Sequence, residues 1–112
     1  MLLQLTNRCK EGCPHCLQDA QPDGPEMSMD VFRKSLEFGD YLGTAIYVLS
    51  GGEPTEHSNF HSICLELNDF LGDKEALFCI TSNGLWLNDA EKRDMMEQIT
   101  SLDRFAGMQI YQ

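Results

Sequence analysis

The sequence lacks a long hydrophobic run, an excess of positive charge, and a basic, cleavable leader after Met1. Without an apolar stretch of about twenty residues, no membrane-spanning helix is expected. Eighteen acidic residues against eight basic ones give a formal net charge of −10. Duplex nucleic acid and anionic membranes both require a cationic surface, so neither is an expected partner. We therefore expect a soluble, cytoplasmic protein.

The sequence has no sign of disorder, low complexity or internal repeats. Its 112 residues are 42% hydrophobic and 9% aromatic, which is an ordinary composition for a globular protein. A chain of this length can bury a modest core in one domain at most.

A fourth clustered cysteine is also missing. Cys9, Cys13 and Cys16 follow a C-x3-C-x2-C spacing directly after a short apolar run. Thiolates this close in sequence bind a metal or an iron–sulfur cluster in a reducing cell. Cubane clusters normally take four cysteines, so three would leave one iron open to an external ligand. Cys64 and Cys79 lie in apolar stretches, and we expect them to be small buried hydrophobic residues without a disulfide.

Hydrophobic periodicity predicts strands that alternate with helices. Apolar and β-branched runs predict strands at residues 2–5, 44–49, 75–81 and 105–111. Helical spacing and caps predict helices that begin near Ser28, Phe60 and Asn88. This order favours an α/β fold with parallel strands and right-handed crossovers. The run 44–49 shows no alternation, which is typical of a strand covered on both faces.

Polar and glycine-rich segments follow each of the first three predicted strands. The cysteine loop follows the first, Gly-Gly-Glu-Pro at 51–54 follows the second, and Ser-Asn-Gly at 82–84 follows the third. In parallel α/β sheets and barrels, ligands bind at the carboxyl ends of the strands. The topology therefore predicts a site at this edge of the sheet.

Taken together, these three segments resemble the radical S-adenosylmethionine (radical SAM) superfamily. Thr-Asn-Arg precedes the cysteine triplet, and Gly-Gly-Glu-Pro and Thr-Ser-Asn-Gly occur in the expected order. The resemblance implies that residues 1–112 are the radical SAM core domain, truncated after its fourth strand. The fold would be the first half of a partial (βα)6 TIM-like barrel.

The resemblance also implies cofactors and chemistry. A [4Fe–4S] cluster would bind the amino and carboxylate groups of S-adenosylmethionine at its open iron. Electron transfer would then yield a 5′-deoxyadenosyl radical that abstracts hydrogen from a substrate. An external electron donor of the flavodoxin or ferredoxin type is implied. Peptide- and protein-modifying members are the most similar, and the sequence leaves the substrate open.

Site residues follow from the resemblance position by position, and no catalytic residue is assigned. The cluster ligands are Cys9, Cys13 and Cys16, and the implied cofactor contacts are His15, Gly51, Gly52, Glu53, Pro54, Ser82 and Asn83. His15 would lie near the adenine, and the segment 51–53 would bind the methionine amino group. Ser82 and Asn83 would reach the methionine carboxylate or the ribose. At the fourth strand the family often has a serine where this sequence has Tyr111.

Simpler interpretations remain for several residues. The cysteines could form a zinc site completed by His15, Cys64 or Cys79, in an iron–sulfur or zinc-binding module without radical catalysis. Ser-Asn-Gly at 82–84 is equally typical of a turn. His57 and His61 are expected at the surface, and Trp86 is expected to be a packing anchor.

Overall fold

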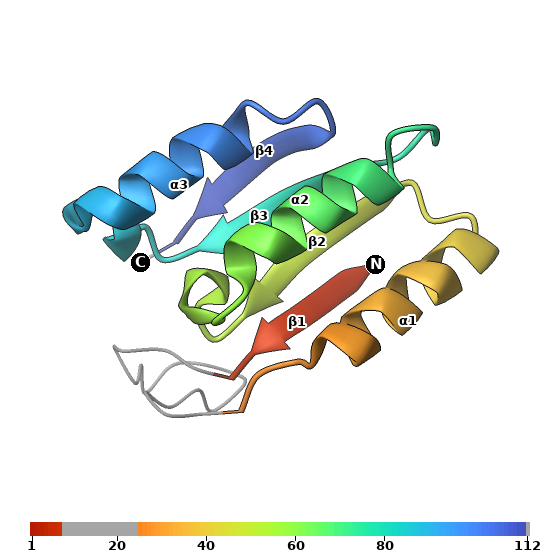
Figure 1. Cartoon of the computed structure of the whole chain (residues 1–112), viewed down its shortest axis with the longest axis horizontal. Coiled ribbons are helices and arrows are strands. Elements are labelled where there is room, and N and C mark those ends of the chain that lie inside the picture. The colour runs from red at the N-terminus through yellow and green to blue at the C-terminus, as the bar shows by residue number, and fades with distance from the viewer. Residues whose placement is uncertain (8–24, 112) are drawn as a thin grey trace.

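The computed structural model describes residues 1–7 and 25–111 (Figure 1). This part of the chain contains strands alternating with helices, in the order that the sequence predicts. The elements are β1 (Leu2–Thr6), α1 (Met29–Tyr41), β2 (Ile46–Gly51), η1 (Pro54–Glu56), α2 (Phe60–Phe70), β3 (Leu77–Ser82), η2 (Leu85–Asn88), α3 (Ala90–Thr100) and β4 (Phe105–Ile110). The two short 3-10 helices, η1 and η2, follow β2 and β3 and were not predicted from the sequence.

The strands form one parallel sheet in the order β1-β2-β3-β4. Each strand therefore pairs with the next one along the chain, as right-handed βα repeats require. The register aligns the carboxyl ends, because Thr6 pairs with Gly51 and Ser82 with Ile110. This arrangement confirms the predicted α/β class of parallel βα repeats and places the carboxyl ends of the described strands along one edge.

Local sequence signals explain where the helices begin. The Ser28 hydroxyl accepts a hydrogen bond from the Val31 N–H at 3.2 Å and caps α1 as expected. The Asp89 carboxylate accepts from the Lys92 N–H at 3.2 Å and caps α3, one residue after the predicted start at Asn88.

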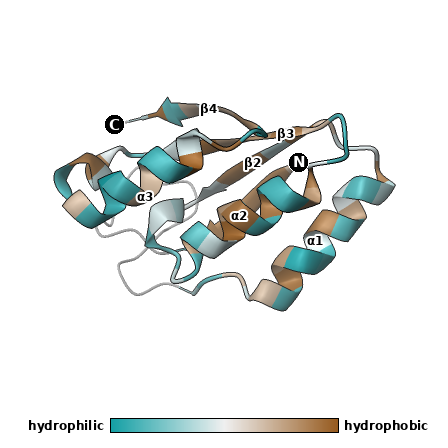
Figure 2. Ribbon diagram, turned by 45° about the horizontal axis from the view of Figure 1, so that its top comes forward, coloured by the Kyte–Doolittle hydropathy of each residue, from teal (hydrophilic) through white to brown (hydrophobic). Residues whose placement is uncertain are grey.

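All three α-helices lie on the same face of the sheet (Figures 1 and 2). Their hydrophobic sides pack on alternate strand residues, which form a single apolar core. The fully or nearly fully buried members include Leu3, Leu5, Phe32, Leu36, Tyr47, Leu49, Phe60, Ile63, Cys64, Leu67, Leu71, Phe78, Ile80, Met96 and Ile99. No helix in the described ranges is both long enough and apolar enough to cross a membrane.

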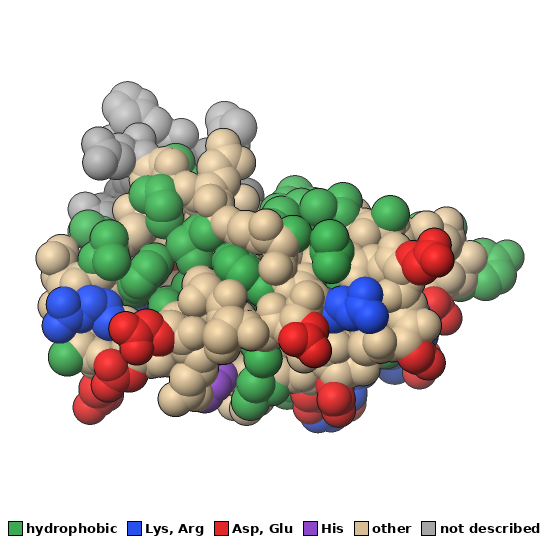
Figure 3. All heavy atoms as spheres, turned by 90° about the horizontal axis from the view of Figure 1, so that it is seen from above, with side chains coloured by type: hydrophobic (Ala, Val, Ile, Leu, Met, Phe, Trp, Pro, Cys, Tyr) green, Lys and Arg blue, Asp and Glu red, His purple; other side chains and the backbone are tan. Residues whose placement is uncertain are grey.

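The expectation that residues 44–49 are covered on both faces is wrong for this chain. Tyr47 and Leu49 are buried, whereas Ile46 is 46% exposed and Val48 is half-buried. The apolar run contains no alternation because both faces carry hydrophobic residues, yet helices cover only one of them. Figure 3 shows hydrophobic side chains gathered on the side of the molecule that carries β4, where Ile110 is 48% exposed.

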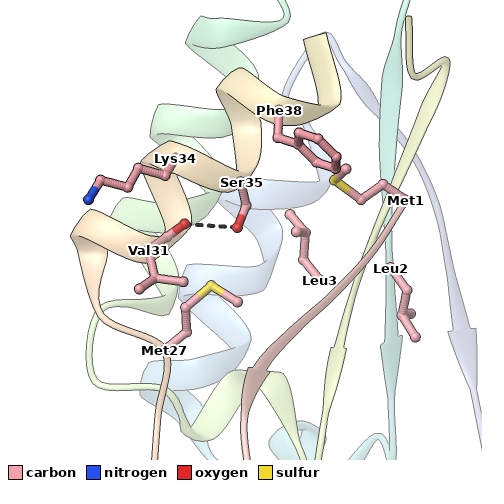
Figure 4. A pocket seen from close by; sticks show the side chains of 8 residues that line it. All are labelled: Met1, Leu2, Leu3, Met27, Val31, Lys34, Ser35 and Phe38. Atoms are coloured by element: carbon pink, nitrogen blue, oxygen red, sulfur yellow. Dashed lines mark hydrogen bonds between the residues drawn. The ribbon is translucent and has the colours of Figure 1, made fainter. Parts of the chain in front are cut away.

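A second apolar feature is a hollow of about 410 Å³ between β1 and α1 (Figure 4). Met1, Leu3, Met27, Val31 and Phe38 are among the residues that line it. It lies between a strand and its helix and not at the polar loops, so it is separate from the predicted site.

We expect Gly39→Ala to destabilise the protein. A Cβ at Gly39 would lie 2.5–2.9 Å from the hydroxyl and ring atoms of Tyr47, which is only 1% exposed. Overpacking lowers the free energy of unfolding by about 1–3 kcal/mol. Replacing glycine by alanine inside a helix raises it by about 1 kcal/mol. Denaturant unfolding should therefore show a net loss of up to about 2 kcal/mol. Glu37→Ala, at an exposed position of the same helix, is the control, and a Gly39→Ala variant more stable than wild type would contradict this packing.

Candidate functional site

The ends of β1 and β2 touch at the edge where the polar loops meet. Gly51 has φ +146°, and a Cβ at this position would collide with the backbone oxygen of Thr6. The next residue, Gly52, donates its N–H to that same oxygen at 2.7 Å. Glycine is therefore required at position 51 both by backbone conformation and by the close approach of β1. Gly51 and Gly52 are buried here, next to the end of the first strand.

The segment at residues 25–27 returns to the carboxyl end of β1. The Asn7 N–H donates to Pro25 O at 2.7 Å, the Met27 N–H donates to Leu5 O at 2.6 Å, and Thr6 forms an antiparallel bridge with Glu26. Residues 7 and 25 are therefore hydrogen-bonded neighbours. The predicted cluster ligands Cys9, Cys13 and Cys16, together with His15, fall between them and lie outside the described residues. Their roles stay predictions.

His57 is buried, and the expectation that it lies at the surface is wrong. It is 4% exposed, its Nε2 lies 2.7 Å from Met27 O, and its Nδ1 accepts the Asn59 N–H at 2.9 Å. These partners assign the Nε2–H tautomer, because a carbonyl can only accept. The His57 side chain thus connects the start of α2 to the segment at residues 25–27. Its main partner is a backbone carbonyl 30 positions away, which no local pattern reveals. His61 is half-buried.

The carboxylate of Glu53 is the most extensively bonded polar group at this edge. Its Oε2 accepts from the Thr55 hydroxyl at 2.5 Å, the Thr55 N–H at 3.4 Å and the Ser82 hydroxyl at 2.9 Å. Its Oε1 accepts from the Asn83 N–H at 2.8 Å. Glu53 has φ −131° and ψ 108°, the extended backbone that is favoured before a proline. Pro54 then begins η1. The Glu53 side chain therefore links the loop after β2 to the loop after β3.

The same carboxylate is buried without a cation from the described residues. Glu53 is only 2% exposed, and none of the described residues forms an ion pair with it. The nearby Lys92 instead pairs with Glu56 at 3.0 Å. A buried charge is costly unless it is hydrogen-bonded and paired. Glu53 has the hydrogen bonds, and a positively charged ligand would complete the pairing.

Ser82 and Asn83 also contribute to the turn after β3. The Asn83 Oδ1 accepts the Leu85 N–H at 3.0 Å, and Gly84 adopts φ +79°. The Ser82 hydroxyl accepts from the Gly84 N–H at 3.1 Å and from the indole N–H of Trp86 at 3.0 Å. The turn interpretation is therefore correct, and the same turn supplies two donors to Glu53. Trp86 packs against the core, as expected of an anchor, and is also hydrogen-bonded.

Two further polar groups at this edge were not assigned from the sequence. The Tyr111 hydroxyl donates to Gly52 O at 2.9 Å, from the position after β4 where the family often has serine. The side-chain oxygen of Asn7 is buried and has no hydrogen-bond partner among the described residues. The apolar surroundings of Tyr111 in the sequence gave no signal for its contact, whereas Asn7 stands next to the cysteine segment and could have been singled out.

Cys64 is buried as the sequence indicates, whereas Cys79 is only half-buried, so the expectation that it is buried is wrong. Both thiols are free, and Cys64 is fully buried in the core on α2. Burial raises the pKa of the Cys64 thiol far above its usual range, and burial also raises the pKa of Cys79. Metal ligation requires the thiolate, which both environments disfavour. Among the described residues, no group of three or more His, Cys, Asp or Glu side chains could hold a metal ion.

A small cavity of about 110 Å³ lies beside Glu53, between η1 and the start of α3. Asn83, Trp86 and Lys92 are among the residues that line it. Sites for small-molecule ligands usually enclose about 300–1,000 Å³. The cavity is therefore too small for a nucleoside-sized cofactor, which would have to extend across the loop edge.

The segments on which the family resemblance rests, Gly-Gly-Glu-Pro at 51–54 and Ser-Asn-Gly at 82–84, lie together at the carboxyl ends of β2 and β3. The sequence model of the radical SAM superfamily matches residues 3–108. The chain belongs to the radical SAM superfamily. This finding confirms the family resemblance and the fold class inferred from the sequence.

A curated relative adds a more specific similarity to this radical SAM chain. It is 31% identical over 71 residues to the PqqA peptide cyclase of Bradyrhizobium diazoefficiens. The aligned stretch covers 62% of this chain and 19% of that relative. The chain therefore spans about a fifth of the length of the curated relative that it matches. No solved structure matches the chain.

We expect Gly51→Ala to destabilise this radical SAM chain by about 2–4 kcal/mol, because a Cβ there meets backbone atoms of Thr6 that are themselves hydrogen-bonded. Gly107 is a matched control with a similar φ of +158° and open space at the Cβ position. Gly107→Ala should therefore cost clearly less. Chemical denaturation of both variants measures the difference, and equal losses would show that backbone conformation alone determines the cost.

Proposed function

We propose that this chain is the N-terminal part of the core domain of a radical SAM enzyme. Cys9, Cys13 and Cys16 would hold a [4Fe–4S] cluster whose open iron binds S-adenosylmethionine. The segment from Gly51 to Glu53 would receive the amino group of that cofactor. Membership in the family and the position of Gly51, Gly52 and Glu53 at the carboxyl edge of the sheet support this proposal.

The observation that carries the proposal is the buried Glu53 carboxylate. Four N–H and O–H donors hold it in place, yet no cation pairs with it among the described residues. An amino group fits this environment, because it brings both positive charge and further hydrogen-bond donors. The buried Asn7 oxygen and the Gly52 carbonyl would supply additional acceptors at the same edge.

When bound, the cluster and S-adenosylmethionine would supply a 5′-deoxyadenosyl radical that removes hydrogen from a substrate. The residues of this chain contribute binding and orientation. Glu53 would fix the amino group. The hydrogen-bonded segments 5–7 and 25–27 would hold the two ends of the cysteine segment at the end of β1. Because His57 bonds Met27, it would anchor these two segments to α2.

We further propose a peptide or protein as the substrate class. The support is the relative named as a peptide cyclase, which is similar over 71 residues. An external electron donor of the flavodoxin or ferredoxin type would reduce the cluster. The net charge of −10 fits a role that involves neither nucleic acid nor membrane.

The proposal is tested by anaerobic reconstitution with iron and sulfide, followed by reduction in the presence of S-adenosylmethionine. The expected product is 5′-deoxyadenosine, measured by liquid chromatography. Cluster binding without this product would favour the alternative of an iron–sulfur module without radical catalysis. Zinc in place of iron would contradict both the cluster and the radical mechanism.

We expect Cys→Ala at position 9, 13 or 16 to abolish cluster binding, measured by iron content and the visible absorption of the reconstituted protein. Cys64→Ala is the matched control, because Cys64 lies in the core and its thiol stays protonated. It should keep the cluster and lose about 1–2 kcal/mol of stability through the cavity that it creates. Equal cluster loss from Cys64→Ala would overturn the assignment of the ligands.

Glu53→Gln should weaken binding of S-adenosylmethionine at least about tenfold while the cluster is retained. The amide removes the negative charge and places an NH2 group against donors that require an acceptor. Isothermal titration of the reconstituted protein measures the affinity. Glu66→Gln, which breaks a surface ion pair with Arg33, is the control and should bind as wild type does. Unchanged affinity in Glu53→Gln would remove Glu53 from the site.

A further inference from the structure

Within the site, the direction of the Ser82 hydroxyl is determined by its three partners. The Gly84 N–H at 3.1 Å and the Trp86 indole N–H at 3.0 Å can only donate. The third partner is the Glu53 Oε2 at 2.9 Å, which as a carboxylate oxygen can only accept. The hydroxyl hydrogen of Ser82 must therefore point at Glu53. Ser82 is fully buried, so solvent does not compete for any of these positions.

These contacts leave the Ser82 oxygen no position for a ligand. One donated and two accepted hydrogen bonds are the full capacity of a hydroxyl group. A cofactor could bond Ser82 only by breaking a contact inside a buried network, which costs about 1–3 kcal/mol. The family resemblance assigned Ser82 a direct contact with the cofactor, and the geometry favours an indirect role.

The two oxygens of Glu53 are held unequally. Among the described residues, Oε2 receives three donors, two from Thr55 and one from Ser82, whereas Oε1 receives only the Asn83 N–H. Each carboxylate oxygen can accept about two hydrogen bonds at full strength. The described donors therefore saturate Oε2 and leave Oε1 an acceptor position for a further donor.

We propose that Trp86 and Ser82 are positioning residues, which hold Oε2 of Glu53 so that Oε1 faces the amino group of S-adenosylmethionine. This inference rests on the proposed function. The two N–H groups that donate to the Ser82 oxygen polarise its O–H and strengthen the bond to Glu53. A carboxylate already fixed in one orientation loses less conformational freedom when the amino group binds. Trp86 thus acts on the cofactor through Ser82, to which its indole N–H donates.

The test compares Ser82→Ala and Trp86→Phe with wild type after anaerobic reconstitution. Trp86→Phe keeps an aromatic ring at a half-buried position and removes the N–H donor to Ser82 together with part of the indole volume. We expect the dissociation constant for S-adenosylmethionine, measured by isothermal titration, to rise about tenfold in Ser82→Ala and about threefold in Trp86→Phe. In steady-state assays of 5′-deoxyadenosine, KM should rise while kcat stays within about twofold. Ser82→Thr, which restores the hydroxyl, should recover most of the affinity.

Ser101→Ala is the matched control. Its hydroxyl donates to the Gln98 carbonyl at the exposed end of α3, away from the loop edge, so this variant should bind as wild type does. A merely structural role of Ser82 would lower the melting temperature without changing the affinity of the folded fraction. That result, or wild-type affinity in both Ser82→Ala and Trp86→Phe, would overturn the proposal.

Trp86 also provides a readout that does not depend on turnover. It is the only tryptophan in the sequence, so tryptophan fluorescence reports on the surroundings of Trp86. Addition of S-adenosylmethionine should shift the emission of wild type, and the shift should be lost in Ser82→Ala, in which the connection to Glu53 is cut.

The failure of this inference can be distinguished from failure of the proposed function. If Glu53→Gln loses affinity and Ser82→Ala does not, Glu53 binds the amino group without positioning by Ser82, and only this inference is wrong. If wild type itself binds no S-adenosylmethionine, the proposed function and the inference that rests on it are both wrong.

Discussion

The burial of one carboxylate determines how the loops of this edge are arranged. Glu53 can remain buried only while donors from two loops satisfy it, and they come from Thr55 after β2 and from Ser82 and Asn83 after β3. Removing a partner from a buried charge costs far more than the bond itself contributes when both partners are present. The two loops are therefore held in one relative position, and a cationic group would stabilise that position further.

Parallel topology makes this arrangement possible. Each strand pairs with the next along the chain, so successive βα loops emerge at the same edge and at neighbouring positions. Gly51 allows β2 to end against the backbone of Thr6, which places Glu53 beside the end of β1 as well. Larger residues at this position would separate the strands at the point where the site forms. The loop sequence is thus constrained both by the chemistry of the site and by the spacing of the sheet.

The sequence predicted the elements of the fold because each has a local cause, such as the apolar stripe of α2 or the Ser28 cap of α1. It also predicted which loops converge, since parallel strands leave little choice. The burial of His57 and the contact of Tyr111 with Gly52 could not be predicted. In both cases a side chain bonds a backbone carbonyl far away in the sequence, and a backbone carbonyl has the same chemistry at every position. The exposed face of β2 was missed for a different reason, because hydrophobic residues on both faces conceal which one the helices cover.

The short helix η1 connects the two halves of the proposed site. Glu53 precedes it and His57 follows it, and its turns are closed by the Glu56 N–H to Glu53 O at 2.9 Å and the His57 N–H to Pro54 O at 3.1 Å. One rigid turn therefore carries both the carboxylate proposed for the amino group and the histidine that holds Met27, where the chain returns from the cysteine segment. A cofactor that binds both the cluster and Glu53 would need Glu53 and His57 at a fixed separation. A single turn of helix fixes this separation more directly than contacts through the core could, because few backbone dihedrals lie between the two residues.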